Sequence, residues 1–89
     1  MNKYGAMAQE HWKRWLPSRY SQISDADSFF SALGEEIQTR VDELSRAIAG
    51  EDPPDEAFLA KVGRLNMARM DAEAEVLREL ALLEPEAEP

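Results

Sequence analysis

Cysteine is absent from this chain of 89 residues, and histidine occurs once, as His11. Without thiols the chain cannot form a disulfide framework or a thiolate metal site, and one histidine cannot build a multi-histidine metal centre. Glycine-rich phosphate loops, nucleophile elbows and Glu-x-x-His metal motifs are also missing from the sequence. We therefore expect a protein without enzymatic activity, cofactor or bound metal.

Long hydrophobic runs are missing as well. No apolar stretch approaches the ~20 residues that a membrane-spanning helix needs, and the N-terminus lacks the apolar core of a secretory signal. We therefore expect a cytoplasmic protein that does not enter a membrane. A chain of this length forms one domain at most and buries little more than ~60% of its unfolded surface. Its core must be thin, so oligomerisation or partner binding is a reasonable expectation.

Basic residues are few, and the formal net charge is −8 at pH 7. Residues 1–20 carry four basic groups against one acidic group, which gives +3, whereas residues 21–89 carry 6 basic and 17 acidic groups, which gives −11. The acidic part disfavours nonspecific binding to nucleic acid and to anionic membranes, because both require positive charge. It suits either solubility alone, or a basic partner, or mimicry of nucleic acid.

The longest periodic stretch runs from Asp55 to Leu83. Its apolar residues recur at steps of three and four, which predicts a helix: Phe58, Leu59, Val62, Leu65, Met70, Val76, Leu77, Leu80 and Leu83. We expect Asp55 to be the N-cap and Pro85 to stop the run. Such a helix would span about 43 Å, which is long for so small a domain. Part of it should therefore overhang or meet another chain.

A second long helix is predicted from the start signal Ser24-Asp25-Ala26-Asp27 to about Ala49, with Gly50 as its C′ residue. Its apolar stripe is equally regular: Phe30, Leu33, Ile37, Val41, Leu44 and Ile48. Only 51–54, with two prolines, separates the helices, which predicts an antiparallel hairpin whose stripes face each other. Gly34 and Gly63, inside the two helices, are expected to allow close packing.

A shorter helix is predicted over Ala6–Leu16, after a loose segment 1–5. Pro17 should end or bend it, and one more turn follows over Ser18–Ile23. The predicted fold class is therefore all-α, a three-helix arrangement in which the short N-terminal helix packs against the hairpin. Residues 1–83 form a single helical domain in this prediction, and residues 84–89 form an acidic, disordered tail.

Aromatic and basic residues gather near the N-terminus, and we take Trp12, Trp15, Arg19 and Tyr20 as candidate contacts. Tryptophan, tyrosine and arginine are enriched in protein-binding hot spots. Basic residues between aromatics can also bind single-stranded nucleic acid by stacking and phosphate contact. The alternative is that the two tryptophans only cover a thin core.

Polar residues interrupt the apolar face of the long C-terminal helix. Asn66, Arg69 and Glu73 are spaced by three and four, so they lie on one side. They form either a solvated face, with an Arg69–Glu73 pair worth about 0.2–0.5 kcal/mol, or a part-buried cluster. A part-buried cluster would fix the register against a neighbouring helix or receive a partner.

The run 62–69, Val-Gly-Arg-Leu-Asn-Met-Ala-Arg, followed by 72–80, Ala-Glu-Ala-Glu-Val-Leu-Arg-Glu-Leu, resembles the C-terminal part of the small transposon-encoded TnpV proteins. At the front, a glycine, a basic segment and a Pro-x-x-Tyr element are similar to that family's. The chain departs from the pattern at 24–30, which replaces a longer apolar and glycine-bearing stretch. The resemblance implies an accessory protein of a mobile genetic element, and it marks these positions: Pro17, Tyr20, Asn66, Arg69 and Glu73.

We therefore expect a non-enzymatic accessory or adaptor protein of a mobile element that acts through protein–protein binding. Its partner is another protein or a second copy of the chain. The alternative is a nucleic-acid-directed regulator. In that reading, either the N-terminal basic-aromatic segment contacts DNA or the acidic surface imitates DNA. A purely self-associating structural bundle is a third reading.

Overall fold

A computed structural model describes residues 1–87, and within that range the chain forms helices and no strand. The helices are α1 (Lys3–Trp15), α2 (Pro17–Ser21), α3 (Ala26–Ala49) and α4 (Phe58–Leu80). The predicted all-α class is confirmed. No helix in the described range is both long and apolar enough to cross a membrane.

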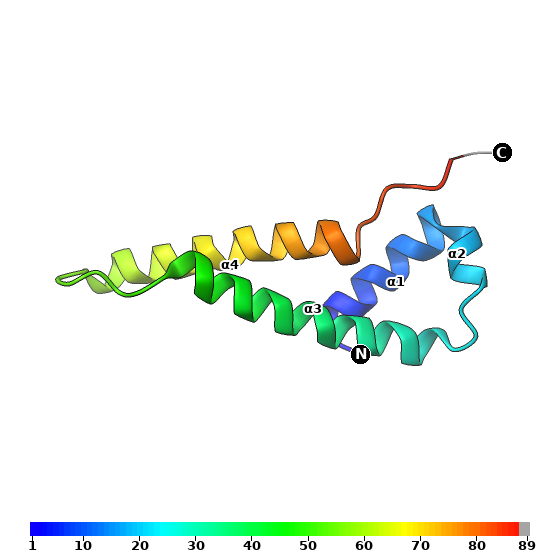
Figure 1. Ribbon diagram of the computed structural model, residues 1–89, viewed down its shortest axis with the longest axis horizontal. Coiled ribbons are helices and arrows are strands. Elements are labelled where there is room, and N and C mark those ends of the chain that lie inside the picture. Colours follow the sequence, from blue (N-terminus) through cyan, green and yellow to red (C-terminus); the bar gives the residue numbers. More distant parts are fainter. Residues whose placement is uncertain (88–89) are drawn as a thin grey trace.

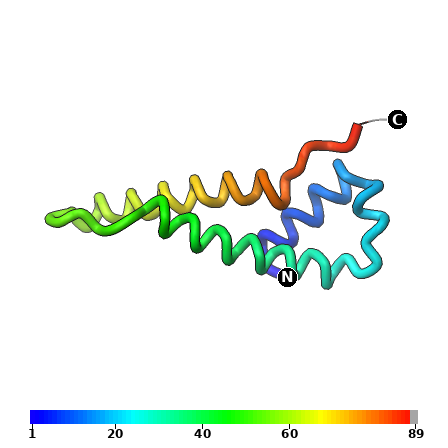
Figure 2. The backbone as a smooth tube through the Cα atoms, viewed as in Figure 1, coloured from blue at the N-terminus to red at the C-terminus, as the bar shows by residue number. Residues whose placement is uncertain are grey.

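The two long helices lie side by side, because α4 folds back along α3 after the turn at 50–57 (Figure 1). The shorter α1 lies across the half of this α3–α4 pair that holds the start of α3 and the end of α4. We call this the proximal half, and the half next to the turn the distal half. The tube view shows the resulting elongated outline, which measures 56 × 26 × 17 Å (Figure 2). Its distal half carries no third helix.

The start and end of α3 follow the signals in the sequence. The Asp25 side chain caps the helix by accepting hydrogen bonds from the backbone N–H and the hydroxyl of Ser28, at 3.2 and 2.8 Å. These bonds lower the pKa of Asp25. Gly50 ends the helix with a φ of 64°, a left-handed value that favours glycine.

The helix α4 is shorter than expected at both ends. Ala57 is its N-cap, without a side-chain hydrogen bond, so the prediction of Asp55 was wrong. Asp55 instead lies in the turn with a φ of 64°, a left-handed conformation that aspartate tolerates better than most residues. At the other end the helix stops at Leu80 rather than Leu83. Beyond this end, the carbonyl oxygens of Ala81 and Leu83 accept hydrogen bonds from Trp12 and His11 of α1.

The first five residues are ordered by contacts with α3, so the prediction of a loose segment was wrong. Asn2 caps α1 by accepting from the Gly5 N–H at 2.9 Å, and its amide donates to the carbonyl of Gly34 at 2.9 Å. A methyl group added to Gly34 would lie 2.8 and 3.0 Å from the backbone N and Cα of Gly5, and it would overlap the Asn2 side chain. The expected close packing at Gly34 is therefore confirmed.

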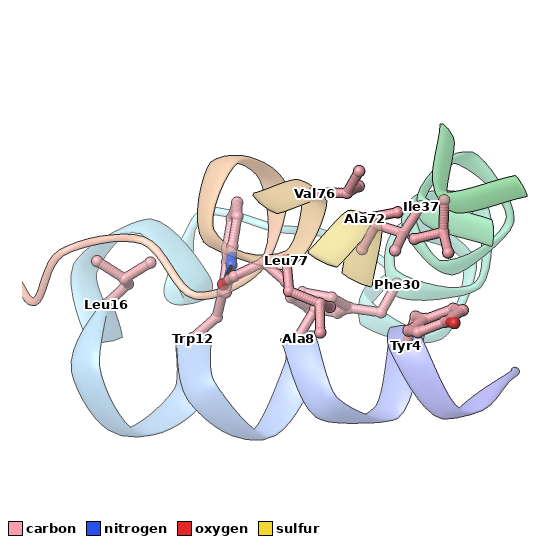
Figure 3. Packing of buried hydrophobic residues seen from close by; sticks show 11 residues of the cluster. Tyr4, Ala8, Trp12, Leu16, Phe30, Ile37, Ala72, Val76 and Leu77 are labelled. Atoms are coloured by element: carbon pink, nitrogen blue, oxygen red, sulfur yellow. Dashed lines mark hydrogen bonds between the residues drawn. The ribbon is translucent and has the colours of Figure 1, made fainter. Parts of the chain in front are cut away.

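The hydrophobic core lies in the proximal half. Figure 3 shows Tyr4, Ala8 and Trp12 of α1 pointing toward α3 and α4, and Leu16, the C-cap of α1, is buried in the same cluster. The edge of the Trp12 ring meets Phe30 of α3 at 5.4 Å between ring centroids. The members of the core cluster that belong to α4 begin only at Ala72.

The distal part of the predicted apolar stripes is not covered. Phe58, Leu59, Val62, Leu65 and Met70 are exposed, although the facing of two stripes predicted their burial. The reason is that two helices alone cannot cover both sides of a wide apolar face, and α1 ends its contact in the proximal half. Gly63 also packs against nothing, because a methyl group built there meets no atom within 4 Å. The expectation of close packing at Gly63 within the single chain was therefore wrong.

Candidate interaction surfaces

The four N-terminal candidates divide into core and surface. Trp12 is 7% exposed, and its indole Nε1–H donates to the carbonyl of Ala81 at 2.9 Å. Tyr20 is partly buried, and its ring stacks on Phe30 with centroids 5.9 Å apart. Trp15 is 43% exposed, and Arg19 is exposed as well. Trp12 and Tyr20 therefore shape the end of the core, whereas Trp15 and Arg19 are accessible.

The exposed members belong to a surface that we call the basic-aromatic corner, formed by Arg14, Trp15, Pro17, Ser18 and Arg19 where α1 turns into α2. Pro17 starts α2, a position that suits its fixed φ and its missing N–H. The Arg14 guanidinium lies over the Trp15 ring at 4.9 Å from the centroid, a cation–π contact. The corner therefore combines positive charge with an accessible aromatic face.

The C-terminal segment of the same chain lies against this corner (Figure 1). The backbone N–H of Glu86 donates to the carbonyl of Trp15 at 2.9 Å. Its carboxylate accepts from the backbone N–H groups of Arg19 and Ser18, at 2.9 and 3.2 Å, and mainly the Arg19 bond lowers the pKa of Glu86. The predicted tail includes Glu88 and Pro89, which lie outside the described residues. One acidic side chain of the tail thus already contacts the corner.

The polar cluster of α4 connects this helix with α3 and α1. Arg69 is bonded to Asp42 of α3 at 3.0 Å, reaches the Tyr4 hydroxyl of α1 at 3.5 Å and pairs with Glu73 at 3.6 Å. Glu73 in turn lies 3.9 Å from the ammonium group of Lys3. The hydrogen bond with Asp42 is the main cause that raises the pKa of Arg69 further. These contacts form a part-buried cluster that links α1, α3 and α4.

Asn66 lies apart from that cluster. It is exposed and lines a groove between the end of α3 and the start of α4, together with Leu65 and Arg69 of α4 and Ser45, Arg46, Ala49 and Gly50 of α3. The three polar candidates therefore do not act as one unit: two fix the helices, and the third faces the distal half.

A second arginine, which the sequence reasoning did not select, closes the turn between α3 and α4. Arg64 contacts the carboxylates of Glu56 at 2.9 Å and Asp52 at 2.7 Å, and it also donates to the carbonyl of Ala49. Its signal in the sequence was the acidic turn, 51–56, followed one and two helical turns later by Lys61 and Arg64. This clamp holds the distal end of the pair together without an apolar core.

Several large apolar side chains are exposed in the distal half, and six of them make up what we call the distal face: Ile48, Phe58, Leu59, Val62, Leu65 and Met70. Leu59 is 80% exposed and Phe58 is 76% exposed, and the other four are exposed by 38–63%. Residues 58–70 contain no acidic side chain, although the chain as a whole is acidic. The distal face is therefore apolar and free of acidic groups, in contrast to residues 71–86, which carry six acidic groups and one basic group.

Comparison with family models, curated proteins and solved structures finds no match for this chain. The resemblance to the TnpV proteins therefore stays a prediction. Among the described residues, no three histidine, aspartate or glutamate side chains gather closely enough to hold a metal ion. The distal face and the basic-aromatic corner remain as the two candidate sites.

Proposed function

We propose that the chain is a non-enzymatic accessory or adaptor protein of a mobile genetic element and that it acts by binding a protein through its distal face. The scaffold in this proposal is an antiparallel hairpin of α3 and α4, braced by α1, in a cytoplasmic protein. The mobile-element context depends on the resemblance to the TnpV proteins alone.

The observation that carries the proposal is the exposure of large apolar side chains on the distal face. Full burial of a Leu or Phe side chain contributes about 1.5–3 kcal/mol, so covering Phe58 and Leu59, each more than three-quarters exposed, would add about 1–2 kcal/mol apiece. Contiguous exposed apolar patches on small soluble proteins commonly mark interaction sites. The face is also already helical, so binding would order little additional backbone.

The polar candidates take two roles in this proposal. Asn66 borders the distal face and is a contact residue, whereas Arg69 and Glu73 act as register residues that keep the α3–α4 pair and α1 aligned. Trp15 and Arg19 form a second, smaller contact surface at the opposite end of the molecule. Trp12 and Tyr20 support that surface from within the core.

The test uses the full chain as bait in a lysate of its host cells. The double substitution Leu59→Ser and Val62→Ser removes apolar surface from the distal face without touching the core cluster. Its matched control is Met7→Ser, which changes a comparably exposed residue of α1. We expect the control to retain the partners of the wild-type protein and the double variant to lose them. Identical partner sets for all three proteins would refute the proposal.

The alternative, a nucleic-acid-directed regulator, is favoured by one observation, the stacking of Arg14 on an accessible Trp15 beside Arg19. Direct binding of a single-stranded oligonucleotide should quench tryptophan fluorescence, weaken steeply with salt and be lost in Trp15→Ala. An acidic mimic of DNA would instead show no affinity for the oligonucleotide but would compete with it for a basic protein. Absence of both effects would eliminate this alternative.

A further inference from the structure

We infer that the partner of the distal face is a second copy of the same chain, so that two molecules join at their distal ends about a two-fold axis near Gly63. This inference rests on the proposed function, because it names the protein that the distal face binds.

The first support is the size of the face. The exposed fractions of its six side chains together equal about three and a half whole side chains. At about 150 Å² for each whole side chain, the low end of the range for aromatic side chains, this amounts to roughly 500 Å² of apolar surface. A stable specific interface buries about 800 Å² on each partner. The distal face alone therefore supplies most of what one copy contributes to a dimer.

The second support is the distribution of charge. Residues 51–70 carry four acidic and three basic groups and have a net charge of −1, so the rest of the chain carries −7. In a two-fold dimer the same surface of both copies meets, so the acidic parts of the two chains repel each other and so do their basic N-terminal parts. The distal ends, which are nearly neutral, meet at the lowest electrostatic cost. The basic groups there are already paired, Arg64 with Asp52 and Glu56, and Arg69 with Asp42. The distal end therefore offers no excess charge that would attract a strongly charged partner, whereas binding of a second copy does not require such an attraction.

The third support is Gly63, which is exposed inside α4 and where an added methyl group would meet no atom of the described residues outside its own helix within 4 Å. Glycine at such a position weakens a helix relative to alanine. The other helical glycines of this chain, Gly5 and Gly34, lie where two backbones touch. Gly63 would lie at such a close backbone contact only if a helix of another molecule packed against it.

The spacing of α4 places this glycine within the apolar face. Leu59, Gly63, Asn66 and Met70 follow one another at steps of four, three and four, so they form one row along the helix. A two-fold interface brings the same surface of both subunits together. If the two rows cross at Gly63, the two glycines face each other and let the helix backbones approach closely, with Leu59 and Met70 of each copy on either side of the crossing. The result is a four-helix bundle at the centre, with the basic-aromatic corners at the two outer ends.

Sedimentation equilibrium of the full chain over about 1–200 µM tests the inference. We expect a concentration-dependent shift from the 10.1 kDa monomer to twice that mass, with a melting temperature that rises with concentration. Gly63→Gln should weaken the dimer at least tenfold while leaving the helical circular dichroism of the monomer unchanged or higher, since nothing in the single chain opposes a side chain there. The matched control Met7→Gln should dimerise like the wild type.

A cross-linking experiment gives a second, independent readout, because the chain has no cysteine of its own. Asn66→Cys, next to the proposed axis, should form a disulfide-linked dimer on mild oxidation, and Ala32→Cys, exposed on the proximal half of α3, should not. A protein that stays monomeric throughout the range would overturn the inference. The proposed function would then stand or fall on the partner experiment with Leu59→Ser and Val62→Ser. The inference would also be overturned by a dimer that forms a disulfide through Ala32→Cys and whose affinity is unchanged by Gly63→Gln.

Discussion

The contact between α1 and α3 at Gly34 makes a quantitative prediction about how this fold is held together. Replacing Gly34 by alanine adds one methyl group inside a long helix. In an open position that change would stabilise the helix by about 0.5–1 kcal/mol. Here the methyl group would lie 2.8 and 3.0 Å from backbone atoms of Gly5 and would overlap the Asn2 side chain. Backbone atoms cannot rotate away, so α1 as a whole must shift.

The shift should remove two kinds of stabilisation. Overpacking of a close contact typically costs about 1–3 kcal/mol. Displacing Asn2 also disturbs the cap of α1 and the bond to the Gly34 carbonyl, and loss of an N-cap costs about 1 kcal/mol. Subtracting the gain in helix propensity leaves a net loss of about 1–3 kcal/mol. With a urea m-value of about 1 kcal/mol/M, the unfolding midpoint should fall by about 1–3 M.

The matched control is Gly63→Ala, which adds the same methyl group to the same kind of residue in open space. At concentrations low enough to keep the protein monomeric, it should raise the unfolding free energy by about 0.5–1 kcal/mol. Urea titrations followed by circular dichroism and by tryptophan fluorescence measure both variants. If Gly34→Ala proved as stable as the wild type or more stable, the reasoning about the α1–α3 contact would be refuted.

Three further predictions concern the polar and aromatic contacts. Arg69→Met should lower the unfolding free energy by about 1–2 kcal/mol, because it removes the hydrogen bonds that join α4 to α3 and α1. An unchanged unfolding free energy in a urea titration would contradict this prediction. The pKa of Glu86 is lowered, so its contact with the basic-aromatic corner is complete above the ordinary glutamate pKa and is lost as the pH falls through the lowered pKa. An acid titration followed by tryptophan fluorescence should therefore show a transition that the variant Glu86→Gln lacks. Trp12→Phe should lower the unfolding free energy by about 1–2 kcal/mol, because it leaves the Ala81 carbonyl unpaired and removes packing. Trp15→Phe should change the unfolding free energy by less than about 0.5 kcal/mol, because that ring is on the surface. Equal losses of stability in thermal unfolding would contradict the assignment of one ring to the core and one to the surface.

Local signals predicted the parts of the fold that depend on local physics. The cap at Asp25, the stop at Gly50 and the apolar period between them determine α3 within a residue or two. The order at the N-terminus could not be predicted in that way. It depends on Asn2 and Gly5 meeting Gly34, a contact between residues about 30 positions apart.

Periodicity also cannot say how far along a stripe another element reaches. The apolar residues of α4 recur at helical spacing both before and after the polar interruption at 66–73. The core cluster nevertheless takes its α4 members only from Ala72 onward, so the first half of the helix is left as a surface. For the same reason Trp12 and Trp15, three positions apart on one helix, could not be separated into core and surface. Whether each tryptophan is buried or exposed depends on which side of α1 faces α3. The spacing placed Asn66, Arg69 and Glu73 on one side of the helix, but it could not show that only Arg69 and Glu73 reach α3 and α1, because those partners come from distant parts of the chain.

The hydrogen bond between Trp12 and Ala81 has a consequence for how the chain folds. It joins residues 69 positions apart, and the bond between His11 and Leu83 joins residues 72 apart. Such contacts can form only after the intervening chain has become compact, since closing a long loop of disordered residues carries an entropic cost. The α3–α4 pair, closed by a short turn and the Arg64 clamp, should therefore assemble first, and α1 should dock last. The same order in reverse makes α1 the element that detaches most readily, and its release would uncover the proximal core while leaving the distal end of the molecule intact.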